Sequence, residues 1–252
     1  MSPDYIINSI YNLSDFFKKE ENLEFGIEKK FLKNNKTFVL KVILSPKSNS
    51  KPPTDKILFR RLNKKGYSCL YYHIPSSVLS SDINETIRRF GIVKNQIKLD
   101  ILKLKSEHSF ERVDIIASSL GVVSACLISN NNNDINNVFL VVPGSCLASS
   151  LWKGIRTQKL KKIYEKQNIK LEQLQTLWQS LAPKNNISAL DNKNIFIAIS
   201  KSDKVIPYPF GKELADLVKT KYPQNTSIAE NKYLGHYFTV LKYYFFSKKL
   251  LE

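Results

Sequence analysis

The sequence of 252 residues is poor in side chains that hold metals or form disulfides, with three cysteines and three histidines. Cys69, Cys126 and Cys146 show neither a CxxC pair nor any other metal-ligand spacing, and each lies among apolar residues. We therefore expect three buried free thiols and no metal site. Glycine is also scarce, with eight in the chain. A glycine between two buried segments therefore calls for a physical reason.

Long hydrophobic runs are absent, and no apolar stretch approaches the roughly 18 residues that a membrane-spanning helix needs. The N-terminal segment, "MSPDYIINSIYNLSDFF", has an acid at Asp4, no early basic cluster and no small-residue cleavage site. These features do not match a secretory signal. We therefore expect a cytoplasmic protein.

Acidic residues are outnumbered, with 22 against 39 basic ones and a net charge of +17. A dedicated surface for nucleic acid or an anionic membrane would give such a balance. However, the bases are mostly lysines scattered over many segments, and lysine, asparagine and isoleucine share AT-rich codons. Arginine, which makes the better bidentate phosphate contacts, is scarce. We favour a compositional bias over a nucleic-acid site, and an anionic membrane surface stays open as a partner.

Strands and helices alternate along the chain. An alternating segment (23–32) and an apolar segment (37–46) flank a turn-like "KNNK" and predict a hairpin. Helical patterns then separate apolar strands, with one long helical pattern over 80–106 that has a break near Gly91 as an alternative. Strands that are apolar nearly throughout are typical of a parallel sheet covered on both faces. The sequence predicts one α/β domain over residues 1–252.

A glycine and two serines follow the strand "VDIIA" in the stretch "ASSLG". A strand that turns at once into a helix strains its apex residue, and small residues two before and two after must make room. Ala117 and Gly121 frame Ser119 in this way, whereas Ser118 would be framed by bulky Ile116 and Leu120. The pattern therefore predicts Ser119 as a nucleophile at the carboxyl end of a strand.

Two partners complete a catalytic triad, because a serine needs a base and the base needs a carboxylate. His236, in "KYLGHYFTV", follows the last predicted strand, and Asp203, in "SKSDKVIP", follows the strand "NIFIAIS". Asp191 and His108 each precede a strand and are expected at the opposite edge of the sheet. Ordinary turn or helix-cap roles for Asp203 and His236 are the structural alternative.

With these three motifs, the chain from Thr37 onward resembles the α/β-hydrolase superfamily. The resemblance implies a mostly parallel sheet of eight strands with helices on both faces. It also implies a small helical lid over about residues 149–183. We expect Trp152 of the lid to line the substrate pocket, and His73, which closes a strand, to lie at its rim.

The resemblance also implies an oxyanion hole. The N–H of Leu120, at a helix N-terminus, is the expected first donor. The family's histidine–glycine motif is missing, and "VILSPKSNSKPP" stands in its place. Pro46 has no N–H, so Ser45 or Lys47 must supply the second donor, and we favour Lys47.

These assignments predict a serine hydrolase of a small carboxylic ester or thioester, with Ser119, Asp203 and His236 as the triad and no cofactor. An acyltransferase uses the same groups. A non-catalytic binding protein with this fold is the competing hypothesis, since the first elbow glycine is replaced by Ala117 and the oxyanion motif is missing. The sequence does not indicate an oligomeric state.

Overall fold

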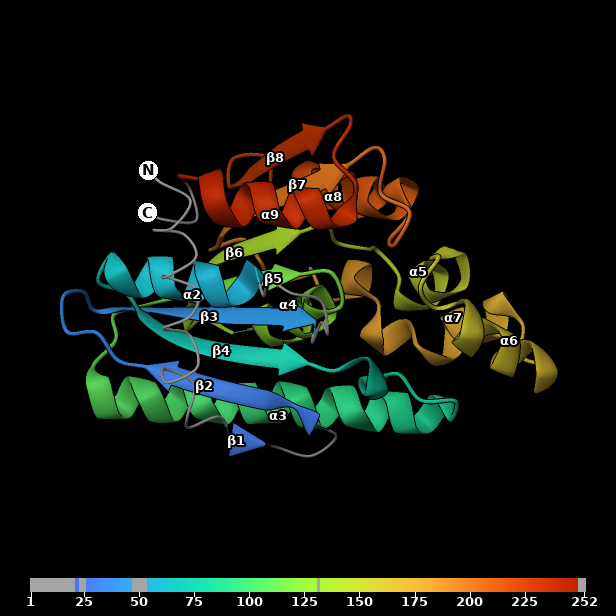
Figure 1. The fold of residues 1–252 in the computed structure, drawn as a ribbon, viewed down its shortest axis with the longest axis horizontal. Coiled ribbons are helices and arrows are strands. Elements are labelled where there is room, and N and C mark those ends of the chain that lie inside the picture. Colours follow the sequence, from blue (N-terminus) through green and yellow to red (C-terminus); the bar gives the residue numbers. More distant parts are fainter. Residues whose placement is uncertain (1–20, 23–25, 47–53, 131, 249–252) are drawn as a thin grey trace, which may run out of the picture.

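A mixed sheet with helices on both faces forms the centre of the protein (Figure 1). The structure is a computed structural model that describes residues 21–22, 26–46, 54–130 and 132–248. The strands follow the order β1-β2-β4-β3-β5-β6-β7-β8. Their bounds are β1 Glu21–Asn22, β2 Glu28–Leu32, β3 Val39–Pro46, β4 Ser68–Ile74, β5 Arg112–Ser118, β6 Ile135–Val141, β7 Asn194–Ser200 and β8 Thr226–Asn231.

The expected α/β class with a mostly parallel sheet is confirmed, because every pairing from β4 to β8 is parallel. Only the first two strands depart from it, since β1 and β2 are antiparallel to each other and β2 is antiparallel to β4. The central strands β3, β4 and β5 are buried on both faces, which explains their nearly continuous apolar sequences.

The predicted hairpin is wrong. Strand β2 pairs with β4, and β3 lies on the far side of β4, between β4 and β5. The burial of the two strands gives the reason. Strand β2 is mostly half-buried, which suits a place near the edge of the sheet, whereas β3 is buried except at its two end residues, which suits the centre. The "KNNK" loop is tied to neighbouring elements instead, with the Asn34 N–H donating to Ser68 Oγ at 2.9 Å.

Helices cover both faces of the sheet. One face packs against α2 and α9, and the other against α3, α4 and α8. The helix predicted over 80–106 is one continuous helix, α3, and a side chain at Gly91 would meet no atom within 4 Å. The bounds are α2 Thr54–Lys64, α3 Ile83–His108, α4 Gly121–Ser129, α5 Leu147–Lys153, α6 Gln158–Lys166, α7 Leu171–Leu177, α8 Tyr208–Lys221 and α9 His236–Phe246.

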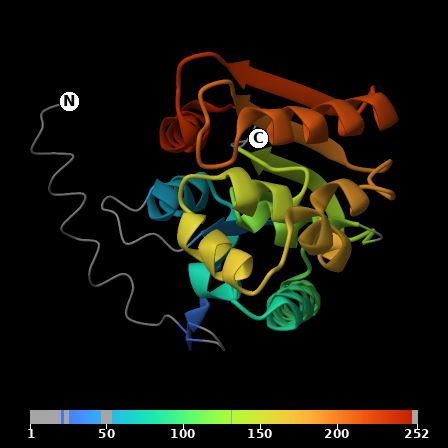
Figure 2. The ribbon, with the colours of Figure 1, turned by 90° about the vertical axis from the view of Figure 1, so that its right-hand side faces the viewer.

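The short helices α5, α6 and α7 lie beyond the carboxyl ends of the strands, and Figure 2 looks onto that end of the molecule. Tyr164 of α6 and Trp178 after α7 are fully buried and pack edge to face, with ring centroids 6.0 Å apart. The Tyr164 hydroxyl donates to the Ser80 carbonyl, and the Trp178 indole N–H donates to the Ile83 carbonyl at 3.2 Å. The helices are therefore anchored to the start of α3.

Among the helices within the described residues, none combines the length and apolar character that crossing a membrane requires. The three cysteines are free and buried, as expected. Burial raises the pKa of the Cys126 thiol to about 12 and raises that of Cys69 still further. Cys69 and Cys126 are therefore core residues whose thiols are poor nucleophiles.

Candidate active site

Ser119 occupies a strained turn between β5 and α4. Its φ is +52°, a left-handed conformation that costs a non-glycine residue about 1–2 kcal/mol. The Ser119 N–H donates to the Val141 carbonyl at the end of β6, at 3.0 Å, which holds the turn against the neighbouring strand. Ser118 is instead the last residue of β5 and is buried. The strand–turn–helix geometry of an elbow therefore places Ser119 at its apex.

A glycine is needed at position 121 because strand β3 approaches it closely, and not only because it follows the turn at Ser119. A Cβ at this position would lie 2.3 Å from the Leu44 carbonyl oxygen of β3, closer than any real Cβ contact. Ala117 of β5 is buried and pairs in register with Leu44 of β3. The small residues around Ser119 thus allow the helix to start directly against the sheet.

Asp203 and His236 form a buried hydrogen-bonded pair. The distance from His236 Nδ1 to Asp203 Oδ2 is 2.7 Å, and each side chain is 4% exposed. The other carboxylate oxygen of Asp203 accepts the N–H groups of Val205 at 2.8 Å and Ile206 at 3.0 Å. An ionised carboxylate can only accept, so in the neutral ring Nδ1 carries the proton and Nε2 keeps a lone pair, the state that a general base needs.

Ser119 and His236 line the same cavity, which has a volume of about 210 Å³. Within the described part of the chain, no hydrogen bond joins the Ser119 hydroxyl to the imidazole ring. The three predicted triad residues are nevertheless gathered at one end of the sheet, after β5, β7 and β8. Most of the cavity wall is apolar, formed by Leu79, Leu120, Val122, Val123, Leu147, Leu151, Val205 and Ile206.

The structure describes one of the two predicted oxyanion donors, Leu120. Leu120 is the N-cap residue of α4 and lines the cavity, and none of the described residues accepts its N–H. Pro46 also lines the cavity, at the end of β3. Lys47, the predicted second donor, lies outside the described residues.

The placement of Trp152 in the substrate pocket is corrected by the structure. Leu147, Ser150 and Leu151 form the face of α5 that lines the cavity with Ser119. Trp152 is one residue further around the helix, and it lines a separate depression beside α6. There the Lys161 ammonium lies 5.5 Å from its ring centroid. The period of the helix therefore turns Trp152 away from the site.

The placement of His73 at the pocket rim is also wrong, because it does not line the cavity. It is a buried residue of β4 whose Nδ1 lies 3.2 Å from Glu28 Oε2 on the adjacent strand β2. His108, as expected, lies at the opposite end of the sheet, where it ends α3 and stacks on Phe31. Among the described residues, no group of three histidine, cysteine or acidic side chains could hold a metal.

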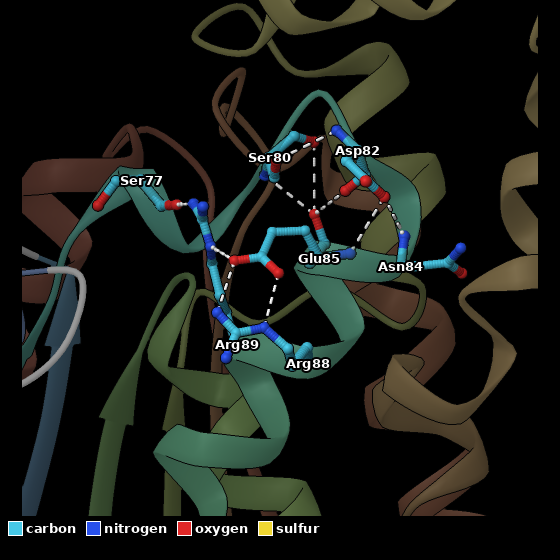
Figure 3. A network of polar contacts seen from close by, with 8 residues as sticks. Ser77, Ser80, Asp82, Asn84, Glu85, Arg88 and Arg89 are labelled. Carbon is cyan, nitrogen blue, oxygen red and sulfur yellow. Dashed lines mark hydrogen bonds and ion pairs between the residues drawn. The ribbon is translucent and has the colours of Figure 1, made fainter.

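Ser76 and Leu79, which precede α3, form part of the cavity wall. A network of polar contacts surrounds the start of α3 next to them (Figure 3). Asp82 caps α3 by accepting the N–H groups of Asn84 and Glu85. Glu85 accepts hydrogen bonds from Arg88 and Arg89 at 2.6–2.7 Å, which lower its pKa to about 2. Arg89 also donates to the Ser77 carbonyl. This network holds the wall in place.

Sequence reasoning missed several polar residues of the cavity: Ser76, Ser150, Arg156, Thr157 and Tyr237. Tyr237 directly follows the predicted base, so its position was readable in principle. Arg156 had a weaker signal, as a rare arginine inside the lysine-rich lid segment. Which residues of α5–α7 face the cavity depends on how each short helix is rotated, and the sequence pattern does not specify that rotation.

No protein-family profile and no curated protein matches the sequence. Solved structures do match it. The esterase Pf2001 of Pyrococcus furiosus is 15% identical, with a TM-score of 0.61 over 92% of this chain and 86% of that one. TT1662 of Thermus thermophilus is 14% identical, with a TM-score of 0.64 over 93% of this chain and 98% of that one.

A third similar structure is the acylaminoacyl peptidase of Pyrococcus horikoshii, at 14% identity and a TM-score of 0.63. The match covers 90% of this chain but only 39% of that protein, so this chain corresponds to one part of it. The likeness to these structures shows that the chain has the α/β-hydrolase fold. At such low identity its chemistry has to be argued from its own residues.

Proposed function

We propose that this chain, which has the α/β-hydrolase fold, is a serine hydrolase that cleaves a carboxylic ester or thioester. The observation that carries the proposal is the buried 2.7 Å bond between His236 and Asp203, together with a strained serine on the same cavity. A serine in a left-handed conformation at a strand–helix turn, on a cavity that also carries a histidine with a carboxylate partner, supports the pairing of a nucleophile with its base.

The reaction follows from the roles of the three groups. The Ser119 hydroxyl oxygen attacks the substrate carbonyl carbon while Nε2 of His236 takes the hydroxyl proton. Asp203 holds the ring and stabilises the imidazolium that forms. We assign the N–H of Leu120 as the donor that stabilises the oxyanion, with the Lys47 N–H as the candidate second donor.

The attack produces a tetrahedral intermediate. Its collapse breaks the bond between the carbonyl carbon and the alcohol oxygen or thiol sulfur, and the alcohol or thiol leaves with the proton from His236. The acyl group stays on Ser119. A water then attacks the acyl-enzyme, gives its proton to His236, and releases the carboxylic acid and the free serine. If another hydroxyl or thiol takes the place of water, the same steps perform acyl transfer.

The size and lining of the cavity support a small apolar acyl group. A volume of about 210 Å³ with a mostly aliphatic wall suits a short chain better than a bulky polar one. Helices α5–α7, which carry Leu147 and Leu151 of this wall, are the candidate lid. Their anchoring to the start of α3 supports a lid that is fixed rather than freely hinged.

A fluorophosphonate probe tests the proposal directly. We expect it to label the wild-type chain, and Ser119→Ala to lose the label. Ser118→Ala is the matched control, because its hydroxyl lies one residue away in the strand and should not affect labelling. Undiminished labelling of Ser119→Ala would refute the nucleophile, and no turnover across a panel of esters and thioesters would favour the non-catalytic binding protein.

A further inference from the structure

Arg156 is the only lysine or arginine among the described residues that line the active-site cavity. It lies in the short connection between α5 and α6, and its side chain is exposed at the cavity mouth. Its guanidinium carbon lies 4.6 Å from the ring centroid of Tyr237, the residue that follows the proposed base. A cation stacked on an aromatic face keeps its edge donors available to a ligand.

The segment that carries Arg156 is fixed against the loop that carries Asp203. A Cβ on Gly154 would lie 2.4 Å from the Val205 carbonyl oxygen, so only glycine allows this approach. The Ile155 N–H donates to the Lys204 carbonyl at 3.2 Å. Arg156 is therefore held at a set position relative to the proposed triad, as a specificity-determining side chain must be.

Arg156 has no carboxylate partner within the described part of the chain. The acid of the neighbouring loop, Asp203, is already used by His236 and by two backbone N–H groups. Many of the other surface cations are paired, as Lys201 is with Glu230 at 2.8 Å. An unpaired guanidinium beside an apolar cavity leaves strong hydrogen-bond donors for an anion.

A second, independent observation also indicates a polar ligand. Ser150 of α5 lines the same cavity and is 8% exposed. Its buried hydroxyl has no hydrogen-bond partner among the described residues. A buried hydroxyl without a partner is costly, so it is readily explained where a bound molecule supplies the missing contact.

We propose that Arg156 forms an anion subsite and that the substrate is an ester or thioester bearing a carboxylate or similar anion near its acyl chain. The inference rests on the proposed function for the reacting centre. The apolar wall takes the chain, and the guanidinium takes the anion through paired N–H donors. The anion belongs either to the far end of the acyl group or to the leaving group.

Two pairs of esters distinguish these sources. 4-Nitrophenyl hemiglutarate and 4-nitrophenyl butyrate share a leaving group and differ in a terminal acyl carboxylate. 4-(Butyryloxy)benzoate and 4-(butyryloxy)benzamide share an acyl group and differ in charge on the leaving group. We expect Arg156→Gln to lower kcat/KM about 10- to 100-fold for the anionic member of one pair, mainly through KM. The neutral members should change less than about twofold.

Arg156→Lys should restore part of this preference, because it keeps the charge but loses the planar fork. Lys204→Gln is the matched control, since it removes an exposed cation from the adjacent loop without touching the cavity. If Lys204→Gln lowered kcat/KM for the anionic ester as much as Arg156→Gln does, the effect would come from the overall positive charge of the surface and not from a subsite at Arg156. An unchanged anionic-to-neutral ratio in both pairs for Arg156→Gln would overturn the proposal.

The failure of the proposed function would be visible separately. If the wild type turns over none of the four esters, then hydrolysis of these substrates fails, and the subsite is tested by binding. Calorimetry with 4-nitrophenyl hemiglutarate and 4-(butyryloxy)benzoate should then show weaker binding of at least one anion to Arg156→Gln than to the wild type. Equal affinities for both, or no binding by the wild type, would reject the subsite.

Discussion

The strained backbone at Ser119 gives a test that does not depend on knowing the substrate. Replacing Ser119 by alanine removes the hydroxyl but keeps the Cβ that makes φ +52° costly, whereas glycine removes both. The left-handed conformation costs about 1–2 kcal/mol with a side chain present. Glycine in turn costs about 0.5–1 kcal/mol through the extra freedom of the unfolded chain. Ser119→Gly should therefore be at least as stable as Ser119→Ala, by up to about 1.5 kcal/mol.

Ser118 supplies the reference, because it lies in β5 with an ordinary extended backbone. There alanine should be more stable than glycine by at least about 0.5 kcal/mol. Subtracting the two alanine-to-glycine differences cancels the entropy of the unfolded chain and leaves the strain at the apex, on the order of 1–2 kcal/mol.

Urea unfolding of the four variants measures these free energies, and a gain of 1 kcal/mol corresponds to about 2–4 °C in Tm for a chain of this size. Neither Ser119 variant should react with a fluorophosphonate. If alanine were favoured over glycine at position 119 by as much as at position 118, the apex would carry no strain, and the elbow geometry would lose its main structural support.

Three further outcomes are expected. Asp203→Asn should keep the fold but lower kcat by up to about 10⁴-fold, because the amide no longer selects the reactive tautomer of His236; a loss below tenfold in steady-state assays would contradict this role. Tyr164→Phe should lower the free energy of unfolding in urea by about 1 kcal/mol through loss of its bond to the Ser80 carbonyl, and no change would show that the bond does not anchor helices α5–α7. Between pH 9 and about 12, stability should fall as pH rises, because the unfolded chain ionises its thiols before the buried Cys126 does; Cys126→Ala should flatten this slope, and a slope unaffected by the replacement would contradict the shift.

Much of the candidate site was readable from local sequence. The elbow was predicted from the small residues around Ser119, because steric crowding at a strand–helix turn involves only near neighbours in the chain. Asp203 and His236 were predicted as its partners because parallel strands bring their carboxyl ends to one edge, whichever strand is next to which. Their placement in a hydrogen-bonded pair agrees with that reasoning.

The hairpin, Trp152 and His73 show where such reasoning stops. Adjacent segments in the sequence became β2 and β3, which are separated by β4 in the sheet. An aromatic residue in the lid region was expected at the substrate, but the rotation of α5 presents Leu147 and Leu151 instead. Each error concerns which distant elements pack together. The hydrophobic pattern of a segment indicates that a residue is buried, but it does not indicate which element covers that residue.

The sequence alone thus determined the alternation of strands and helices and the identity and order of the candidate triad, because these depend on periodicity and on sterics within a few residues. Only the tertiary structure decided the strand order, the close approach of the Leu44 carbonyl that requires a glycine at position 121, and the presence of Arg156 beside the cavity. Those features depend on contacts between segments far apart in the chain, where packing and backbone approach select one arrangement among many that share the same pattern.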